Sequence, residues 1–456
     1  MRRSKTTDQF LSKVGQFISA HHLLSNDGLQ LVALSGGADS VSLLIALKEL
    51  GYQTEAIHCN FHLRGEESDR DENFCEQLCH KYSIPFHRVH FDTRTYADLH
   101  HVSIEMAARE LRYHYFENLR RALSAENICV AHHAGDNVET VLLNLLSGTG
   151  IHGLTGIKPR NGKIVRPLLS VTREEILDFL KEYDQDYVTD STNLIDDVKR
   201  NKIRLDLLPL MRQVNQGADK NISRCIEHLV EVEKVYNQVI AQEISECTIQ
   251  DHDPYVELSL DLRKLASYTS PSSILFEALS DYGFVSKQIK EITNSLESRN
   301  KTWKSKTHEA LVDNGRLTLV PSSAFGNVHL VIPEPGKYVY HLGKDNEQRI
   351  SVSTLPYSPK DLIRDERLCL LDADKVEFPL TLRNVEAGDR MIPLGMEHSR
   401  LVNDILAEKH QNLFQRRRQL VVAQKDGSIV WIVNVRIANW CRLTDATHKQ
   451  LSIIIE

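Results

Sequence analysis

Cysteine is scarce in this sequence, and long apolar runs are missing. The 456 residues include eight cysteines, none spaced as Cys-x-x-Cys, which argues against a cysteine-held metal site. We expect reduced, mostly packed thiols and therefore a cytoplasmic protein. No run approaches the roughly 18 apolar residues that cross a membrane, so no membrane partner is expected. The basic N-terminal residues also lack the apolar core of a secretion signal.

An excess of positive charge is also missing. The formal net charge is −7, so any nucleic acid would have to be bound through local patches. One such patch lies at residues 199–204, where four of the six side chains are cationic. It contains Arg200, Asn201 and Arg204, and a patch of this kind could contact an RNA backbone.

What the sequence does contain is an ordinary globular composition, with 41% hydrophobic and 26% charged residues. From residue 28 to about residue 190, strand-like and helix-like segments alternate. This alternation predicts an α/β domain with a doubly wound, mostly parallel sheet. The expected strands are residues 29–34, 54–59, 86–91, 128–132 and 164–166. The expected helices are residues 41–50, 67–82, 104–123, 137–146 and 172–182.

The later segments follow other patterns. Charged helical patterns occupy residues 200–211 and 221–249, and residues 255–320 indicate a mixed, mostly helical segment. Short strand-like segments and one helix-like stretch at 401–410 make up the C-terminal part. We therefore expect an α/β domain at residues 1–215, a mostly helical domain at 216–345 and a small α+β domain at 346–456.

The most informative motif follows the first strand and opens a helix: Ser35-Gly36-Gly37-Ala38-Asp39-Ser40. Glycines let the backbone approach an anion, and the free amides of the first helical turn point at it. No lysine follows as in the Walker loop, and the spacing differs from that of the dinucleotide fingerprint. The motif resembles the pyrophosphate loop of the N-type ATP pyrophosphatases, which cleave ATP into AMP and pyrophosphate. A simple strand-to-helix turn is the alternative.

Three further motifs carry candidate site residues. Arg64 lies in a polar segment after the second strand, which either covers a nucleotide or RNA or is only a connecting loop. Arg109 and Arg112 share one face of a predicted helix, which either binds phosphate or is solvated. Asp136 begins another helix, where a carboxylate can also serve as a cap. Because ligands bind at the carboxyl ends of parallel strands, the motifs that follow the strands are expected to converge in one crevice.

The order of the motifs resembles that of the tRNA(Ile)-lysidine synthase family. The family pattern runs Ser-Gly-Gly-x-Asp-Ser, His-x-Asn-His-x-Leu-Arg, Ala-Arg-x-x-Arg-Tyr, His-His-x-Asp-Asp-x-x-Glu-Thr, Gly-x-x-Gly-Leu-x-Gly, Arg-Pro-Leu and Arg-Asn-x-Ile-Arg. The corresponding segments follow in the same order at residues 35–40, 58–64, 108–113, 132–140, 150–156, 166–168 and 200–204. The chain departs from the pattern in two places: Gly135 replaces the first of the paired aspartates, and the segment after the second strand is one residue longer.

The C-terminal part carries a weaker resemblance. Residues 388–396 look like the last domain of the family, in which a lysine cluster often follows. In this chain the basic run comes later, at residues 416–418. The fold implied by the resemblance is an adenine nucleotide alpha hydrolase-like domain followed by domains that contact tRNA.

The resemblance implies a two-step reaction. ATP, with Mg²⁺, adenylates the C2 oxygen of the wobble cytidine in the CAU anticodon of an isoleucine tRNA and releases pyrophosphate. Free L-lysine then attacks C2 through its ε-amine and displaces AMP. The lysidine so formed makes the tRNA read AUA and accept isoleucine. A homodimer is a possible assembly.

Residue roles follow from motif position within this resemblance. Asp39 would help to hold Mg²⁺ through ATP, and Asp136 would bind or deprotonate lysine. The expected phosphate-binding residues are Ser35, Gly36, Gly37, Ala38, Asp39 and Ser40. The side chains expected to steady AMP or tRNA are those of Arg109, Arg112 and Arg204. Further tRNA contacts are expected from Arg64, Arg200, Asn201, Arg416 and Arg417.

Two other functions fit parts of the pattern. A tRNA thiolase on the same fold would use cysteines near the crevice, and Cys59 and Cys129 lie close to predicted strand ends. A nucleotide sensor or tRNA-binding module without catalysis would bind ATP and release no pyrophosphate. The hydroxyl and carboxylate groups of the loop, together with Asp136, argue against an inactive site.

Overall fold

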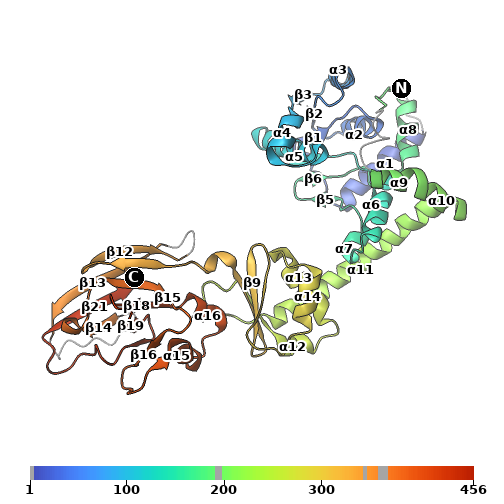
Figure 1. Cartoon of the computed structure of the whole chain (residues 1–456). Coiled ribbons are helices and arrows are strands. Elements are labelled where there is room, and N and C mark those ends of the chain that lie inside the picture. The colour runs from blue at the N-terminus through green and yellow to red at the C-terminus, as the bar shows by residue number, and fades with distance from the viewer. Residues whose placement is uncertain (1–4, 190–197, 343–346, 358–367, 456) are drawn as a thin grey trace. The chain divides into compact units, whose positions relative to one another are not determined.

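The computed structural model describes residues 5–189, 198–342, 347–357 and 368–455. It separates into two compact units, Met1–Tyr236 and Asn237–Glu456, which Figure 1 colours from blue to green and from yellow-green to red. Among the described residues, no helix combines the length and the apolar character that a membrane crossing requires.

A six-stranded sheet forms the centre of the first unit, with the strand order β3-β2-β1-β4-β6-β5. All neighbouring strands are parallel except β5 and β6, so the mostly parallel sheet predicted from the sequence is confirmed. Helices cover both faces of such a sheet, which explains why its central strands are apolar runs. The strands are β1 (Gln30–Ala33), β2 (Thr54–Asn60), β3 (Phe86–His90), β4 (Asn127–Cys129), β5 (Arg160–Asn161) and β6 (Ile164–Val165).

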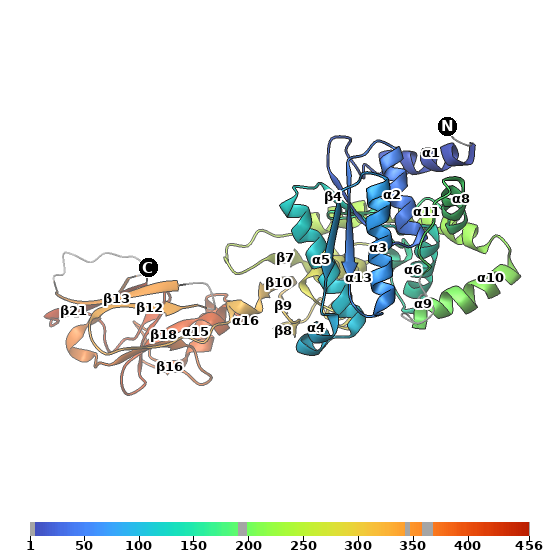
Figure 2. The same ribbon diagram turned by 90° about the horizontal axis from the view of Figure 1, so that it is seen from above.

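The helices of this unit are α1 (Lys5–Ala20), α2 (Ala38–Glu49), α3 (Glu66–Lys81), α4 (Thr93–His100), α5 (Ile104–Ala122), α6 (Ala134–Leu146), α7 (Ile151–Leu154), α8 (Arg173–Glu182), α9 (Val198–Lys202), the π-helix η2 (Ile203–Leu207), α10 (Leu208–Val214) and α11 (Ala218–Cys247), which continues into the second unit. On one face of the sheet, Phe10 of α1 and Phe179 of α8 join Val32 of β1 in an apolar core. On the other face, Phe116 of α5 joins Ile57 of β2. Figure 2 shows α2 and α5 on opposite sides of the strands, as a doubly wound sheet requires.

The second unit begins with helices and an antiparallel sheet. Residues 255–320, expected to be mixed and mostly helical, contain the helices α12 (Leu262–Ala266), α13 (Pro271–Leu279), the short 3₁₀-helix η3 (Ser280–Tyr282) and α14 (Ser286–Thr293). A four-stranded sheet with the order β7-β10-β9-β8 accompanies them, and the sequence pattern did not predict it. Its strands are β7 (Leu258–Asp261), β8 (Lys301–Lys304), β9 (His308–Asp313) and β10 (Arg316–Pro321), followed by η4 (Ser322–Ala324).

Two larger antiparallel sheets form the C-terminal part of this unit, with the orders β11-β15-β18-β19-β20 and β12-β13-β21-β14. Leu382 and Val421 of the first sheet share one apolar core with Ile350 and Ile453 of the second. The strands of the first sheet are β11 (His329–Ile332), β15 (Leu380–Asn384), β18 (Leu420–Ala423), β19 (Ile429–Ile432) and β20 (Arg436–Ile437). Those of the second are β12 (Gly336–His341), β13 (Glu347–Pro356), β14 (Leu368–Asp372) and β21 (Lys449–Ile455).

Short elements complete this part: η6 (Ala373–Lys375), the two-stranded pair β16 (Arg390–Met391) and β17 (Arg400–Leu401), α15 (Val402–Glu408) and α16 (Leu413–Arg418). The helix predicted at residues 401–410 is confirmed as α15. The domain boundary expected between residues 345 and 346 falls between β12 and β13, which pair with each other in one sheet.

Candidate functional site

The loop between β1 and α2 is built to approach an anion. Gly36 has a φ of +89°, in the left-handed region that favours glycine, and a Cβ there would lie 3.3 Å from Sγ of Cys75. The hydroxyl of Ser40 donates to the carbonyl of Gly37 (2.9 Å) and accepts from the amide of Ser35 (3.2 Å), which closes the loop. No side chain caps α2 at Gly37, so the first amides of the helix remain available to an anion.

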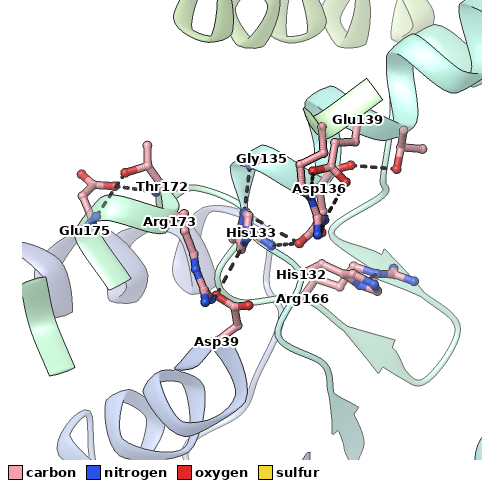
Figure 3. A network of polar contacts seen from close by, with 12 residues as sticks. Asp39, His132, His133, Gly135, Asp136, Glu139, Arg166, Thr172, Arg173 and Glu175 are labelled. Atoms are coloured by element: carbon pink, nitrogen blue, oxygen red, sulfur yellow. Dashed lines mark hydrogen bonds and ion pairs between the residues drawn. The ribbon is translucent and has the colours of Figure 1, made fainter. Parts of the chain in front are cut away.

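Asp39 lies in the first turn of α2 and faces side chains from two other helices (Figure 3). Its Oδ1 pairs with the guanidinium of Arg173, the first residue of α8. Nε2 of His133, at the start of α6, lies 3.8 Å from the same oxygen. The amide of Ala134 donates to the carbonyl of Val171 (2.9 Å), which joins the starts of α6 and α8 directly. The N-termini of three helices, each with a positive dipole end, therefore meet at the loop.

His133 caps α6 with its ring. Nδ1 accepts a hydrogen bond from the amide of Gly135 (3.0 Å), and the amide of His133 donates to Oδ2 of Asp136 (2.9 Å). Because Nδ1 is an acceptor, the proton of the neutral ring resides on Nε2, which faces Asp39. A Cβ at Gly135 would lie only 2.7 Å from Cε1 of the ring. Glycine at position 135 is therefore what permits this ring position.

Replacing Gly135 by alanine is expected to push the His133 ring off the start of α6. We expect Gly135→Ala to lower the free energy of unfolding of the first unit by about 1–2 kcal/mol, because it exchanges a cap for a steric clash. In two-bond ¹⁵N NMR spectra, the His133 ring should lose its single Nε2–H tautomer. Gly15→Ala in α1 is the control, because its Cβ would make an ordinary 3.5 Å contact with Leu50. An unchanged His133 tautomer in Gly135→Ala would contradict this account.

Glu139 connects the predicted basic patch to α6. Its carboxylate accepts hydrogen bonds from Nε (2.6 Å) and Nη2 (2.9 Å) of Arg204 and lies 3.2 Å from Nε of Arg200. Glu139 is only 4% exposed, and its hydrogen bonds raise the pKa of Arg204. Nη2 of Arg204 also lies 3.9 Å from Oδ1 of Asp136. Arg200 and Arg204 are thus held at the site by a buried carboxylate, and Asn201 lies between them on α9.

A partly buried histidine and an arginine join the segments that follow β4 and β6. Nε of Arg166 donates to Nδ1 of His132 (3.1 Å), and its Nη1 donates to the carbonyl of Lys158 (2.8 Å). Burial lowers the pKa of His132 to about 4, so this ring is neutral near pH 7. The neutral His132 ring therefore accepts a hydrogen bond from the cationic Arg166 without adding a further charge to the site.

The other predicted cations of the first unit lie on neighbouring segments. The guanidinium of Arg109 lies 5.3 Å from the ring centroid of Tyr113, and that of Arg112 lies 5.2 Å from the ring centroid of Phe61. Arg64 lies in the loop between β2 and α3, one residue before the N-cap Gly65 of α3. Arg109 and Arg112 of α5 therefore each have an aromatic contact that restrains the side chain.

In the second unit, the predicted basic run lies on α16 and contacts the sheet of β7 to β10. Nη1 of Arg417 donates to Oε2 of Glu309 (2.6 Å), and its guanidinium lies 3.9 Å from the ring centroid of Phe325. Arg416 donates to the side-chain carbonyl of Asn300 (3.2 Å). Burial raises the pKa of Glu309, but the hydrogen bonds from its cationic partners outweigh this and lower it. Arg417 therefore has a partner within the protein before any RNA is bound.

Arg417→Ala is expected to destabilise the second unit by about 2 kcal/mol, less than the loss of a fully buried pair, because Lys304 stays 3.1 Å from Glu309. Arg416→Ala should change its stability by less than about 0.5 kcal/mol. Because the folded pKa of Glu309 is lowered, its stabilising contribution is complete above the ordinary glutamate pKa and is lost as the pH falls through the lowered value. Urea unfolding at pH 7 and pH 3, followed by tryptophan fluorescence, measures this unit alone, since the tryptophans are Trp303, Trp431 and Trp440. Equal stabilities of the two variants at pH 7 would refute the structural role of Arg417.

Comparison with known proteins agrees with this arrangement. Three family models match successive parts of the chain: a PP-loop domain at residues 6–211, a TilS substrate binding domain at 256–322 and a TilS substrate C-terminal domain at 380–453. A tRNA(Ile)-lysidine synthase of Parabacteroides distasonis is 41% identical over 438 residues, covering 96% of this chain and 98% of the relative. One from Porphyromonas gingivalis is 38% identical over 420 residues, covering 89% of each chain. The chain belongs to the tRNA(Ile)-lysidine synthase family.

Membership in the tRNA(Ile)-lysidine synthase family identifies the first unit as an ATP-using PP-loop domain. We refer to the loop of residues 35–40 as the PP-loop, because its Ser-Gly-Gly-x-Asp-Ser pattern lies within the matched domain, between the first strand and the helix that follows it. The cradle of amides in this loop is suited to the phosphates of ATP.

The structure gives contacts to three residues for which the sequence analysis predicted no role; Arg166 and Glu139 lie within the motifs at 166–168 and 132–140, whereas Arg173 lies outside them. Arg173 contacts Asp39, Arg166 contacts His132, and Glu139 holds the two arginines of the basic patch. Arg173 had one sequence signal, the capping-box pattern from Thr172 to Glu175, which marked the start of α8 without indicating what that start would face.

Proposed function

We propose that this chain forms lysidine at the wobble cytidine of an isoleucine tRNA with a CAU anticodon. One observation carries the proposal: the similarity to tRNA(Ile)-lysidine synthases extends over 96% of the chain. The proposed substrates are ATP, free L-lysine and the tRNA, and the products are AMP, pyrophosphate and the modified tRNA.

In the proposed first step, the C2 oxygen of cytosine attacks the α-phosphorus of ATP. The bond from that phosphorus to the bridging oxygen breaks, and pyrophosphate leaves with the electron pair. The loop amides and the hydroxyls of Ser35 and Ser40 would hold the phosphates, aided by the three helix N-termini. Arg109 and Arg112 would steady the AMP portion.

Mg²⁺ would offset the charge that develops on the phosphates. We assign the binding of this ion to Asp39, a carboxylate in the first turn of α2. Among the described residues, no group of three or more metal-ligating side chains occurs. A single protein carboxylate, that of Asp39, fits an ion held mainly by the phosphate oxygens of ATP. Mg²⁺ in such sites takes one or two carboxylates and several oxygens from substrate or water.

In the proposed second step, the ε-amine of lysine attacks C2 and AMP leaves with the electron pair of the C2–O bond. The amine must lose a proton to attack. We assign this role to Asp136, and its geometry supports the assignment: Oδ2 accepts from the amide of His133 (2.9 Å), and Oδ1 lies 3.9 Å from Nη2 of Arg204. Arg204 would neutralise charge beside it and help to retain AMP.

The tRNA is proposed to contact cationic and polar side chains on both units. In the first unit these are Arg64, Arg200 and Asn201, and in the second they are Arg416 and Arg417. Because Arg417 is already paired with Glu309, we expect Arg416 to contribute more to tRNA affinity and to its salt dependence. A homodimer is the assembly we propose to test, by light scattering with and without tRNA.

A thiolase would need a reactive cysteine at the crevice, and the described cysteines near the loop do not suit that role. Burial raises the pKa of Cys59 to about 12 and raises that of Cys75 and Cys129 as well. Cys75 and Cys129 are fully buried. Such thiols remain protonated near pH 7, whereas the thiolate is the reactive form.

Incubation with ATP, radiolabelled lysine and tRNA, followed by mass analysis of the wobble nucleoside, tests the proposal. Lysine incorporated at the wobble cytidine, with AMP and pyrophosphate released in equal amounts, is expected. Sulfur at that position would support a thiolase. ATP binding without pyrophosphate release in the presence of tRNA would indicate a binding module without catalysis.

A further inference from the structure

We propose that Arg173 is a further catalytic residue of the adenylation step, binding the β- and γ-phosphates of ATP and then the departing pyrophosphate. The proposal rests on the proposed function for its reaction. It assigns a role to a residue outside all seven sequence motifs, at a position where α8 meets the PP-loop.

The geometry places the Arg173 guanidinium beside the phosphate cradle. Its Nη1 forms a charged hydrogen bond with Oδ1 of Asp39 (Figure 3). Asp39 lies two residues after Gly37, the N-cap of α2. An anion bound to the first amides of α2 is therefore a close neighbour of this guanidinium. The Nε2–H of His133 approaches the same carboxylate oxygen from α6, at 3.8 Å.

The backbone that carries Arg173 is held firmly. Thr172 and Glu175 form a reciprocal capping box at the start of α8, and Lys13 of α1 donates to Glu175 (2.7 Å). Further along α8, Ile176 and Phe179 are completely buried in the core under the sheet. The base of the side chain is thus fixed by the scaffold, as precise substrate binding requires.

The guanidinium itself is free to change partners. The Arg173 side chain is 43% exposed, and among the described residues Asp39 is its recorded hydrogen-bond and ion-pair partner. Arginine has five N–H donors in a planar fork, which suits phosphate oxygens. The β- and γ-phosphates carry more negative charge than a single carboxylate. When they bind, they compete with Asp39 for Arg173 and leave that carboxylate available to a cation.

During adenylation, negative charge builds up on the oxygen that bridges the α- and β-phosphorus atoms as their bond breaks. A guanidinium on the β-phosphate stabilises that charge and the pyrophosphate that forms. The AMP portion stays attached to the cytosine oxygen and makes no contact with Arg173. The contribution of Arg173 is therefore specific to the two terminal phosphates.

Calorimetric titration of the full-length protein with inorganic pyrophosphate, ATP and AMP tests the proposal without tRNA or lysine, so it can succeed or fail independently of the lysidine assay. Arg173→Gln should weaken pyrophosphate and ATP binding about 10- to 100-fold, since a hydrogen bond to a charged group contributes about 1.5–3 kcal/mol. AMP binding should change less than about twofold, because AMP lacks the phosphates concerned. In the complete reaction, kcat of pyrophosphate release should fall as well.

Two comparisons separate this role from a structural one. Arg173→Lys keeps the positive charge and should recover part of the pyrophosphate affinity. Lys13→Gln removes the ion pair between Lys13 of α1 and Glu175 of α8, and it should leave the affinities for pyrophosphate, ATP and AMP unchanged. If Arg173→Gln weakens AMP as much as pyrophosphate, or weakens neither, the proposal is wrong. If Arg173→Gln does not fold, Arg173→Lys with unaltered pyrophosphate affinity and unaltered kcat would overturn it.

Discussion

Asp136→Asn is expected to reduce lysine incorporation into tRNA at least about 100-fold while leaving adenylation within about threefold of wild type. Asparagine retains an oxygen that accepts the amide of His133, so the cap of α6 should persist. What is lost is the negative charge and the ability to take a proton. The first step needs neither, because its nucleophile is a neutral carbonyl oxygen.

ATP–pyrophosphate exchange in the presence of tRNA measures the first step, and incorporation of radiolabelled lysine measures both steps. Asp92→Asn is a matched control, because Asp92 caps α4 by accepting the amide of Thr95 (3.1 Å) and has no contact with the PP-loop among the described residues. It should leave both activities near wild type. Equal losses of exchange and incorporation in Asp136→Asn would assign Asp136 to ATP binding or folding instead.

The pH dependence separates a base from a binding group at position 136. The ε-amine of free lysine has a pKa of about 10.4, so its neutral fraction rises about tenfold per pH unit below that value. If Asp136 accepts the proton, the deficit of Asp136→Asn should shrink markedly between pH 7 and pH 9. If Asp136 only binds the ammonium group, KM for lysine should rise and the deficit should not shrink with pH.

The sequence predicted the first unit well because its signals are local. Apolar strands and capped helices repeat there, and the PP-loop lies between a strand and a helix that are adjacent in the chain. The sheet of β7 to β10 escaped prediction for a physical reason. In β9 and β10, four consecutive residues are buried, so the alternation of apolar and polar residues that marks a half-buried strand is absent. The pairing of β11 with β15 joins residues about 50 positions apart and leaves no local pattern.

The site was predictable only where its residues are close in sequence. The loop of residues 35–40 and the segment around Asp136 were found as motifs. The pairing of Asp39 with Arg173 depends on how α8 docks against α2, because the two residues are 134 positions apart in the sequence. The role of Gly135 could not be predicted from the sequence either. A glycine in place of an aspartate indicates only the loss of a carboxylate, whereas the structure shows the His133 ring where a side chain at position 135 would lie. The basic patch was found by composition, but its carboxylate partner on α6 was not.

Glu139→Ala is expected to destabilise the first unit by about 3–5 kcal/mol, the largest stability effect we predict for a single residue. The carboxylate is 4% exposed and is shared by Arg200 and Arg204, so its removal takes one shared counter-charge from two partly buried cations. Glu139→Gln should cost less, because it keeps the volume and one acceptor oxygen. An exposed pair provides the control: Glu231→Ala removes the partner of Lys234, whose side chains are 70% and 66% exposed, and should change stability by less than about 1 kcal/mol.

Far-UV circular dichroism during urea unfolding reports on both units, whereas tryptophan fluorescence reports on the second unit alone. In Glu139→Ala, the unfolding transition of the first unit, which fluorescence does not detect, should move to a lower urea concentration. The transition of the second unit should not move. Because Arg204 also lies 3.9 Å from Asp136, freeing it alters the charge beside the proposed base. Lysine incorporation should therefore fall even in urea-free buffer at a temperature where the variant is folded. If Glu139→Ala is as stable as wild type, water or phosphate replaces the hydrogen bonds of Glu139 to Arg200 and Arg204 at no cost in stability. The basic patch would then be held in place by its own helices and not by its ion pairs with α6.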